Sequence, residues 1–223
     1  MLTASQKWLG MSTASRKKRE MQQRQSLILE TARPMLVRDG YHGLSMDRIA
    51  ESLQYSKGTI YNHFACKEEI IIALAIETLE KRLGLFERAA QFSGRSRERM
   101  AAVGVAAELF VRMYFDHFTV EQIIRSASIR EKTSAKRQSL MHSCEARCLG
   151  IVAGIVRDGI AQGELKLPPQ TTPENLVFGL WALSYGAYSI MATTESLVQL
   201  GIGDAFESVR KNQTTLLDGC RWL

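Results

Sequence analysis

Residues 40–69 read GYHGLSMDRIAESLQYSKGTIYNHFACKEE, and this stretch decides the fold. Ser45 suits a helix N-cap, and the apolar residues after it recur at helical spacing, which predicts a short helix over 45–53. Ser56 is a second N-cap and predicts another short helix over 57–63. The inward sides of both helices are apolar, so the two helices pack across each other. The residues they share in this core are Met46, Ile49, Ala50, Leu53, Ile60 and Phe64.

The outward side of the second helix is polar and carries mostly short side chains. It consists of Ser56, Lys57, Gly58, Thr59, Tyr61, Asn62 and His63. Gly58 allows close backbone approach, the hydroxyl groups suit phosphates, and Asn62 and His63 can bond to base edges. Glycine in an exposed helix costs about 1 kcal/mol, and insertion into a DNA groove would justify that cost. The stretch therefore predicts a helix-turn-helix that binds double-stranded DNA.

The same stretch resembles the DNA-binding domain of TetR-family transcriptional regulators. The resemblance covers residues 20–80 and rests on Ser45-Met46-x-x-Ile49-Ala50 and on Ser56-Lys57-Gly58-Thr59-Ile60-Tyr61-x-His63-Phe64-x-x-Lys67-Glu68-Glu69. It implies an all-α fold, with an N-terminal three-helix DNA-binding domain and a C-terminal helical domain for ligand binding and dimerisation. It also implies no catalytic machinery and no cofactor.

The resemblance also assigns roles to single residues. It implies that Ser45, Thr59, Tyr61 and Lys67 contact phosphates. It places four further residues nearest the bases, namely Lys57, Gly58, Asn62 and His63. With Ser56, these form the predicted DNA-binding set.

Four positions depart from the family pattern. Gln54 stands where the family has glycine in the turn, which costs about 1 kcal/mol if that position needs a positive φ. Tyr55 replaces a small aliphatic residue. Cys66 replaces the serine cap before Lys67, and a thiol is a weaker acceptor. Pro34 interrupts the first helix, predicted over 19–39, and is expected to kink it.

Positive charge is concentrated at the N-terminal end. Residues 1–65 contain ten Lys and Arg against five Asp and Glu, whereas the other 158 residues contain nineteen against eighteen. We expect a flexible basic arm over 1–18, and its Arg16-Lys17-Lys18-Arg19 run suits the adjacent DNA backbone or minor groove. The DNA-binding domain is expected over 19–66 and the regulatory and dimerisation domain over 67–223, with a helix over 67–86 as the connector.

Further helices are expected over 98–117, 119–128, 133–162, 173–195 and 203–217. By the resemblance, the last two pair with their mates from a second copy in a four-helix bundle. Gly179, Ala182, Gly186 and Ser189 are small residues three or four apart, and they predict close helix approach at this interface. Dimerisation also suits a pseudo-palindromic operator, whose half-sites lie about 34–36 Å apart.

The resemblance further implies a pocket for a lipophilic or aromatic effector. The candidate lining residues are Phe110, Met113, Tyr114, His117, Phe118, Ile123, Met141, Phe178, Trp181 and Tyr185, with Arg112 and His142 as further polar anchors. These side chains also suit an ordinary apolar core, and that alternative stays open.

Several other functions find little support in the sequence. With 223 residues, 45% hydrophobic and 23% charged, the chain is an ordinary globular protein of one or two domains. It contains no G-x-S-x-G, H-E-x-x-H, phosphate-binding glycine loop or C-x-x-C, so no enzyme is predicted. Cys144 and Cys148 with His142 are too few ligands to predict a metal site, and Cys66 beside Lys67 is a weak candidate redox sensor.

The location follows from two features. Residues 1–15 lack the apolar run of a signal peptide, which favours the cytoplasm. Residues 175–194 carry no charge and have the length of a membrane span, but their polar residues and glycines favour a buried or interface helix. The sequence thus predicts a repressor released from its operator by a ligand. An activator of the same fold is one alternative, and a helical membrane-associated or scaffold protein is another.

Overall fold

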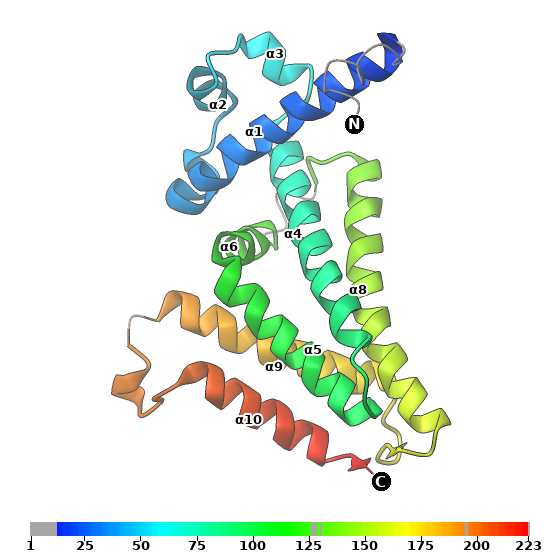
Figure 1. Ribbon diagram of the computed structural model, residues 1–223. Coiled ribbons are helices and arrows are strands. Elements are labelled where there is room, and N and C mark those ends of the chain that lie inside the picture. Colours follow the sequence, from blue (N-terminus) through cyan, green and yellow to red (C-terminus); the bar gives the residue numbers. More distant parts are fainter. Residues whose placement is uncertain (1–12, 126–128, 130, 195, 223) are drawn as a thin grey trace, which may run out of the picture.

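The computed structural model describes residues 13–125, 129, 131–194 and 196–222, and within them it is almost entirely helical. Figure 1 shows the helices in chain order: α1 (Thr13–Gly43), α2 (Met46–Ser52), α3 (Lys57–Tyr61), α4 (Lys67–Ala90), α5 (Ser96–Met113), α6 (Phe115–Ile124), α8 (Ala135–Ala161), α9 (Pro173–Thr193), the 3₁₀ helix η2 (Val198–Leu200) and α10 (Ala205–Asp218). The all-α class is confirmed.

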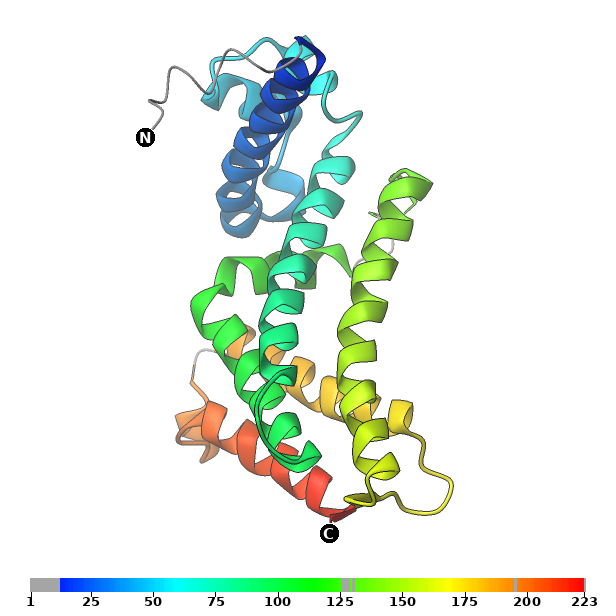
Figure 2. The same ribbon diagram turned by 45° about the vertical axis from the view of Figure 1, so that its right-hand side comes forward.

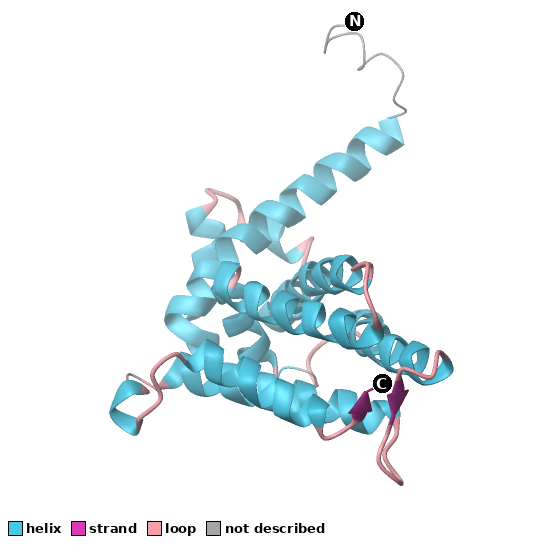
Figure 3. Cartoon of the chain, turned by 60° about the horizontal axis from the view of Figure 1, so that its bottom comes forward, coloured by secondary structure: helices cyan, strands magenta, loops and turns pink. Residues whose placement is uncertain are grey.

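The C-terminal end of the chain is pinned by a very short antiparallel pairing. Strand β1 (Leu165–Lys166) follows α8, and strand β2 (Arg221–Trp222) follows α10, with Leu165 opposite Trp222. Figure 3 shows the two strands side by side near the C-terminus. The sequence did not predict this pairing, because two residues are too short to show an alternating pattern.

The N-terminal domain packs as the sequence predicts. Helices α1, α2 and α3 surround the first turns of α4, and their largest inward side chains are at most 1% exposed. This core includes Ile28, Leu36, Ile49, Ile60 and Phe64. The two short helices therefore owe their stability to tertiary packing, since helices this short are unstable alone.

The start of α1 corrects one prediction. The helix begins at Thr13, so the arm expected over 1–18 is wrong for residues 13–18, and residues 1–12 lie outside the described part. Pro34 lies inside α1 without ending it. The helical backbone breaks instead at Gly40, which has φ 67° and ψ −172°. Only glycine adopts such angles readily, so the break falls there, and one more turn reaches Gly43.

Helix α4 joins the two parts of the molecule. It starts inside the N-terminal domain and descends between α5, α6 and α8 (Figure 2). It ends at Ala90, four residues beyond the predicted connector. The N-terminal core continues into α6 and α8 through Val120, Ile124 and Met141. The N-terminal and C-terminal parts therefore share one apolar core.

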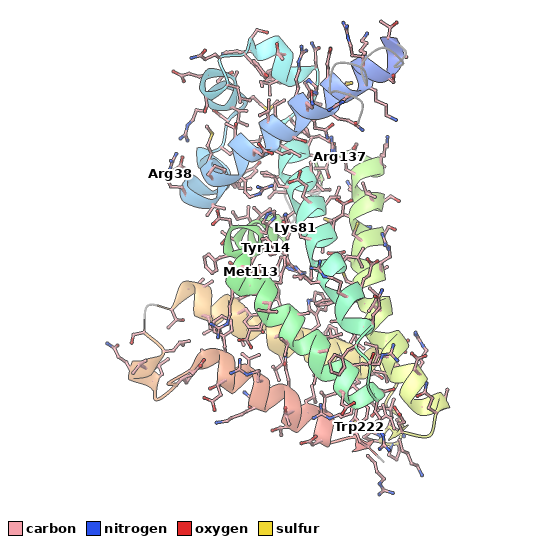
Figure 4. The ribbon with its side chains drawn as sticks, in the orientation of Figure 1. Arg38, Lys81, Met113, Tyr114, Arg137 and Trp222 are labelled. Carbon is pink, nitrogen blue, oxygen red and sulfur yellow. The ribbon has the colours of Figure 1, made fainter. Side chains whose placement is uncertain are left out.

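Two ion pairs add to this junction. Arg33 of α1 contacts Glu77 of α4 at 2.5 Å. Arg137 of α8 contacts Glu69 of α4 at 2.5 Å, and its guanidinium lies 4.9 Å from the centre of the Phe64 ring (Figure 4). Polar as well as apolar contacts therefore join α4 and α8 to the N-terminal helices.

The remaining helices match the predicted ones with shifted ends. Tyr114 has φ −131° and ψ 49°, so α5 stops at Met113, four residues before the predicted end, and α6 starts after it. Gly163, with φ 74°, follows the end of α8. The Thr172 hydroxyl caps α9, and Pro173 occupies its first turn, so the helix begins at the predicted residue.

Helices α8 and α9 are long and apolar enough to cross a membrane, judged by length and composition alone. The core helices of soluble proteins pass the same test. Here α8 packs along α4, with Cys144, Cys148 and Val156 all buried.

Candidate nucleic-acid interface

Polar contacts hold the N-terminal end of helix α2. The Arg48 backbone N–H donates to Ser45 Oγ at 3.2 Å, which caps the helix as predicted. The Arg48 guanidinium pairs with Asp39 at 2.7 Å and also donates to the Gly43 carbonyl. Ser45 is thus partly engaged in capping, and Arg48 fixes α2 against the end of α1.

The turn between α2 and α3 confirms the expected strain. Gln54 has φ 54°, the left-handed region where the family pattern places glycine. A side chain there costs about 1–2 kcal/mol. The Tyr55 N–H donates to the Ala50 carbonyl at 2.9 Å, and the half-buried Tyr55 ring packs against the core, which holds the turn closed.

Helix α3 has one packed side and one open side. Its N-cap is Ser56, whose Oγ accepts from the Thr59 N–H at 3.1 Å and lies 2.9 Å from Thr59 Oγ1. Ile60 is fully buried on the packed side, whereas Tyr61 is 52% exposed. The helix ends at Tyr61, two residues before the predicted end, and Asn62 is its C-cap.

Gly58 on the open side is not required by the protein itself. Its φ is not positive, and a Cβ placed there would meet only Ser56 Oγ, at 3.8 Å. Glycine also weakens a helix relative to alanine by about 1 kcal/mol. Neither backbone conformation nor packing within the described chain therefore explains the residue, which leaves close approach by an outside partner.

Lys57 is exposed and paired. Its Nζ lies 2.6 Å from Asp47 Oδ2, and this hydrogen bond raises the pKa of the lysine. Both side chains are solvent-exposed, so the pair is worth little and can open when a stronger anion arrives. Lys57 therefore stays charged and available for DNA.

His63 and Lys67 are less open than predicted. His63 is half-buried, its Nδ1 has no hydrogen-bond partner in the described chain, and burial together with the positive charge of Arg24 lowers its pKa. Lys67 Nζ donates to the carbonyls of Tyr41 at 2.8 Å and Leu44 at 3.2 Å. Its Nζ also lies 4.0 Å from the centre of the Tyr41 ring, so Lys67 ties α4 to the end of α1.

Cys66 does not fit the redox alternative. It occupies the N-cap of α4 without a side-chain capping bond, as its thiol chemistry predicted. Burial raises the pKa of this thiol, and Sγ donates to the Lys132 carbonyl at 3.5 Å. A reactive cysteine is favoured by a lowered pKa, so these surroundings do not support the sensor interpretation.

The predicted effector residues do not meet in one cavity. Phe110, His117, Phe118 and Met141 are buried in packed clusters, and the His117 ring bonds to Thr78 Oγ1 at 3.0 Å. Met113 and Phe178 are 62% and 63% exposed instead (Figure 4 labels Met113). Tyr114 and Tyr185 are partly buried, and Arg112 and His142 are exposed. Phe178 and Trp181 together line a pocket between α8 and α9. Trp181 alone of the predicted set lines a second cavity.

That cavity has a volume of about 200 Å³ and lies between α5, α8, α9 and α10. Its lining is mainly apolar, with a polar wall from α9 and α10. The lining includes Phe86, Met100, Val103, Gly104, Leu149, Val177, Leu180, Trp181, Ser184, Arg210, Gln213 and Leu217. Sequence reasoning missed this site, although Ala101, Gly104 and Ala107 form a small-residue stripe on α5 that could have indicated it.

The predicted interface residues lie along α9. Gly179 is near α10, because a Cβ there would meet the Leu216 side chain at 3.4 Å. Ala182 is exposed, and nothing in the described chain lies within 4 Å of a Cβ at Gly186. Ser189 is partly buried. Phe178 and Ile190 on the same helix are 63% and 55% exposed, so α9 presents an uncovered apolar surface in the single chain.

No group of three or more potential metal ligands occurs among the described residues. Cys144 and Cys148 are buried on α8, and burial raises the pKa of both thiols. Both behave as apolar core residues.

Comparison with known proteins places these features in context. Residues 28–74, which run from the core of α1 into α4, match the family described as bacterial regulatory proteins, tetR family. The chain is 25% identical over 181 residues to the fatty acid metabolism regulator protein of Bacillus subtilis (strain 168), covering 78% of this chain and 91% of that one. Over 67 residues it is 37% identical to the HTH-type transcriptional regulator UidR of Escherichia coli (strain K12), covering 30% of this chain and 34% of UidR.

Solved structures share the whole fold at lower identity. The TetR family transcriptional regulator PfmR from Thermus thermophilus superimposes with a TM-score of 0.66 at 19% identity, covering 86% of this chain and 94% of PfmR. The ketosteroid transcriptional regulator KstR2 of Mycobacterium tuberculosis does so with a TM-score of 0.65 at 16% identity, covering 90% and 96%. The likeness extends from α1 through the C-terminal helices.

Proposed function

Because the chain belongs to the TetR family of DNA-binding transcriptional regulators, we propose that it is a repressor of a pseudo-palindromic operator. We further propose that a small lipophilic or aromatic molecule releases it from that operator. Regulators of this family bind operator DNA and act as dimers. Repressors occur among the relatives, including AcnR of Corynebacterium diphtheriae, which is 40% identical over 58 residues.

The open side of α3 is the observation that carries the proposal. Lys57, Gly58, Tyr61 and Asn62 are all exposed, while Ile60 on the opposite side is fully buried. This arrangement fixes the helix rigidly and leaves one polar side free for the major groove. Ser45, Ser56 and Thr59 supply hydroxyl groups for the flanking phosphates.

His63 and Lys67 take supporting roles in this arrangement. His63 is neutral near pH 7, because its pKa is lowered, so it can bond to a base edge but adds no charge. Lys67 mainly positions α4 against the N-terminal domain.

Two copies place two α3 helices on one face of the duplex. We assign the interface to the uncovered apolar surface of α9 with α10, including Phe178, Ala182 and Ile190. Phe178 and Ala182 lie one turn apart on α9, so this stripe can pack against its mate in an antiparallel bundle. A rigid dimer is needed because the half-sites of an operator are separated by about one DNA turn.

We assign the effector to the cavity between α5, α8, α9 and α10. It is mainly apolar, and its polar wall includes Gln213, which donates to Ser184 Oγ at 2.8 Å. Its volume of about 200 Å³ lies below the usual 300–1,000 Å³ of ligand sites. A drug-sized occupant would therefore push the walls apart.

One of those walls belongs to the helix that carries the N-terminal domain. Phe86 of α4 lines the cavity, so a ligand that displaces Phe86 tilts α4 and changes the spacing of the two α3 helices. A ligand that prefers the tilted state shifts the population away from the DNA-binding state. We also place the protein in the cytoplasm, where operator DNA lies, and assign it no catalytic role and no membrane partner.

Selection of duplexes from a random DNA pool tests this function. The enriched sequences should contain two inverted half-sites whose centres are about 10 base pairs, or a multiple, apart. The affinity should also fall steeply as salt rises, because phosphate contacts release counterions. Enrichment of no sequence, or of a single asymmetric site, would overturn the proposal.

A further inference from the structure

The N-terminal half of α1 is a helix without a core of its own. Over residues 13–27 every residue except Ser15 and Gln25 is exposed, and the first fully buried side chain is Ile28. Figures 1 and 3 show this half continuing past the rest of the N-terminal domain. Helices of about 15 residues are marginal in water when alone, so contact with a partner would stabilise this one.

This half of α1 is also strongly basic. Residues 13–27 carry five positive residues, Arg16, Lys17, Lys18, Arg19 and Arg24, and one acid, Glu20. Arg16 contacts Glu20 at 3.3 Å, and both side chains are exposed. The segment therefore has a net charge of about +4.

Its orientation relates it to α3. Lys17, Met21, Arg24 and Ile28 follow each other at spacings of four, three and four residues, so they share one side of the helix. Ile28 packs in the same core as Ile60 of α3. The positive charge of Arg24 helps to lower the pKa of His63, which lies just after α3. Figure 1 shows this end of α1 at the same end of the molecule as α3.

We propose that residues 13–27 of α1 form a second DNA-contacting element, which lies along the phosphate backbone beside the half-site bound by α3. The proposal rests on DNA binding by α3. At 1.5 Å per residue the segment is about 22 Å long, which corresponds to roughly six base pairs of duplex at 3.4 Å each. Its contacts are to phosphates, so it adds affinity and footprint length without sequence preference.

The charge and the side-chain pattern favour DNA over an anionic membrane. A membrane-binding helix needs a broad apolar side. Met21 and Leu27 are the large aliphatic side chains of the segment, and their spacing of six residues puts them on different sides of the helix. The segment is also continuous with the DNA-binding domain, whose Lys57 and Tyr61 are exposed at the same end.

A triple variant tests the proposal. Lys17→Gln, Lys18→Gln and Arg24→Gln together remove three charges and keep good helix formers. The matched control, Lys136→Gln, Lys166→Gln and Arg221→Gln, removes three charges from exposed positions of the regulatory part. Both variants should keep the wild-type circular dichroism and mass in solution. The probes are a 40-base-pair duplex centred on the selected site and a mixed-sequence duplex of the same length.

The expected result is specific to α1. The α1 variant should bind both duplexes at least about tenfold more weakly near 0.1 M salt, with a log–log salt slope shallower by about two. Hydroxyl-radical protection should be lost only in the flanking base pairs, and the preferred sequence should not change. The control variant should match the wild type.

Three results would overturn the proposal. The first is an unchanged salt slope in the α1 variant, and the second is an equal loss of DNA affinity in the control variant. The third is that the wild type binds vesicles containing phosphatidylserine and the α1 variant does not, while the DNA affinity of the α1 variant is unchanged. The mixed-sequence duplex separates this inference from the proposed function. If no sequence is enriched by selection, the operator proposal fails, yet the effect of α1 on the mixed-sequence duplex can still be measured.

Discussion

Two helical glycines, Gly58 and Gly104, differ in what a side chain at each position would meet. Gly58 of α3 opens to solvent, where a Cβ would meet only Ser56 Oγ at 3.8 Å. Gly104 of α5 opens into the cavity, where a Cβ would lie 2.9 Å from Gln213 Oε1. Neither has a positive φ. Glycine inside a helix is unfavourable. At Gly104 the close approach of Gln213 within the chain explains it, whereas no contact within the described chain explains it at Gly58.

The two sites differ in how far apart in the sequence their residues lie. The surroundings of Gly58 come from residues 45–67, whereas those of Gly104 come from α5 and α10, more than a hundred residues apart. The residues of the proposed DNA-binding side therefore come from one short segment of the sequence. The cavity, by contrast, forms only when helices far apart in the sequence pack together.

The largest effect is expected at Gly58. Gly58→Leu should leave the free energy of unfolding unchanged or raise it, because leucine favours helix and space is available. The same change should weaken binding to the selected duplex by about 100-fold, because the side chain stands where the DNA must approach. Thermal unfolding and band-shift titration measure the two quantities. Wild-type affinity in a folded Gly58→Leu protein would mean that α3 does not approach a duplex closely.

A smaller effect is expected at Gly104. Gly104→Ala should force the Gln213 side chain into the cavity and weaken binding of the apolar fluorescent probe anilinonaphthalene sulfonate by about tenfold. Gly84→Ala in α4 is the matched control, since nothing lies within 4 Å of a Cβ there. It should raise the free energy of unfolding by about 0.5–1 kcal/mol without changing probe binding. Equal probe affinity in both variants would remove the cavity as the ligand site.

The same contrast explains what could be predicted from sequence. The caps predicted at Ser45 and Ser56 were correct, because a cap depends on residues three positions away. The strain at Gln54 was also correct, since its turn is closed by local hydrogen bonds. The break in α1 falls at Gly40, where the residue type itself favours a stop, and α1 continues through Pro34.

The effector residues were the least predictable part. Aromatic and thioether side chains fill cores and line pockets equally well, so the period of the sequence cannot separate Phe110, which is packed, from Trp181, which lines the cavity. Met113 and Phe178 are exposed for a further reason. No side chain within the described chain covers them, and the periodicity of the sequence does not distinguish an exposed apolar residue from a buried one.

The helical start of α1 was not predicted, because its composition suggested a flexible arm. The run Arg16-Lys17-Lys18-Arg19 is typical of a flexible basic arm. Its residues are nevertheless good helix formers and continue the register of Ile28. The predicted conformation was therefore wrong for residues 13–18, and the role of the charge stays a prediction.

The double variant Lys57→Ala with Tyr61→Ala tests the central claim most directly, because both side chains are exposed on the open side of α3 and neither supports the core. Its affinity for the selected duplex should fall by at least about 100-fold, while its unfolding curve and its mass in solution stay those of the wild type. A folded double variant that binds the duplex with full affinity would contradict the assignment of α3 as the DNA-reading helix.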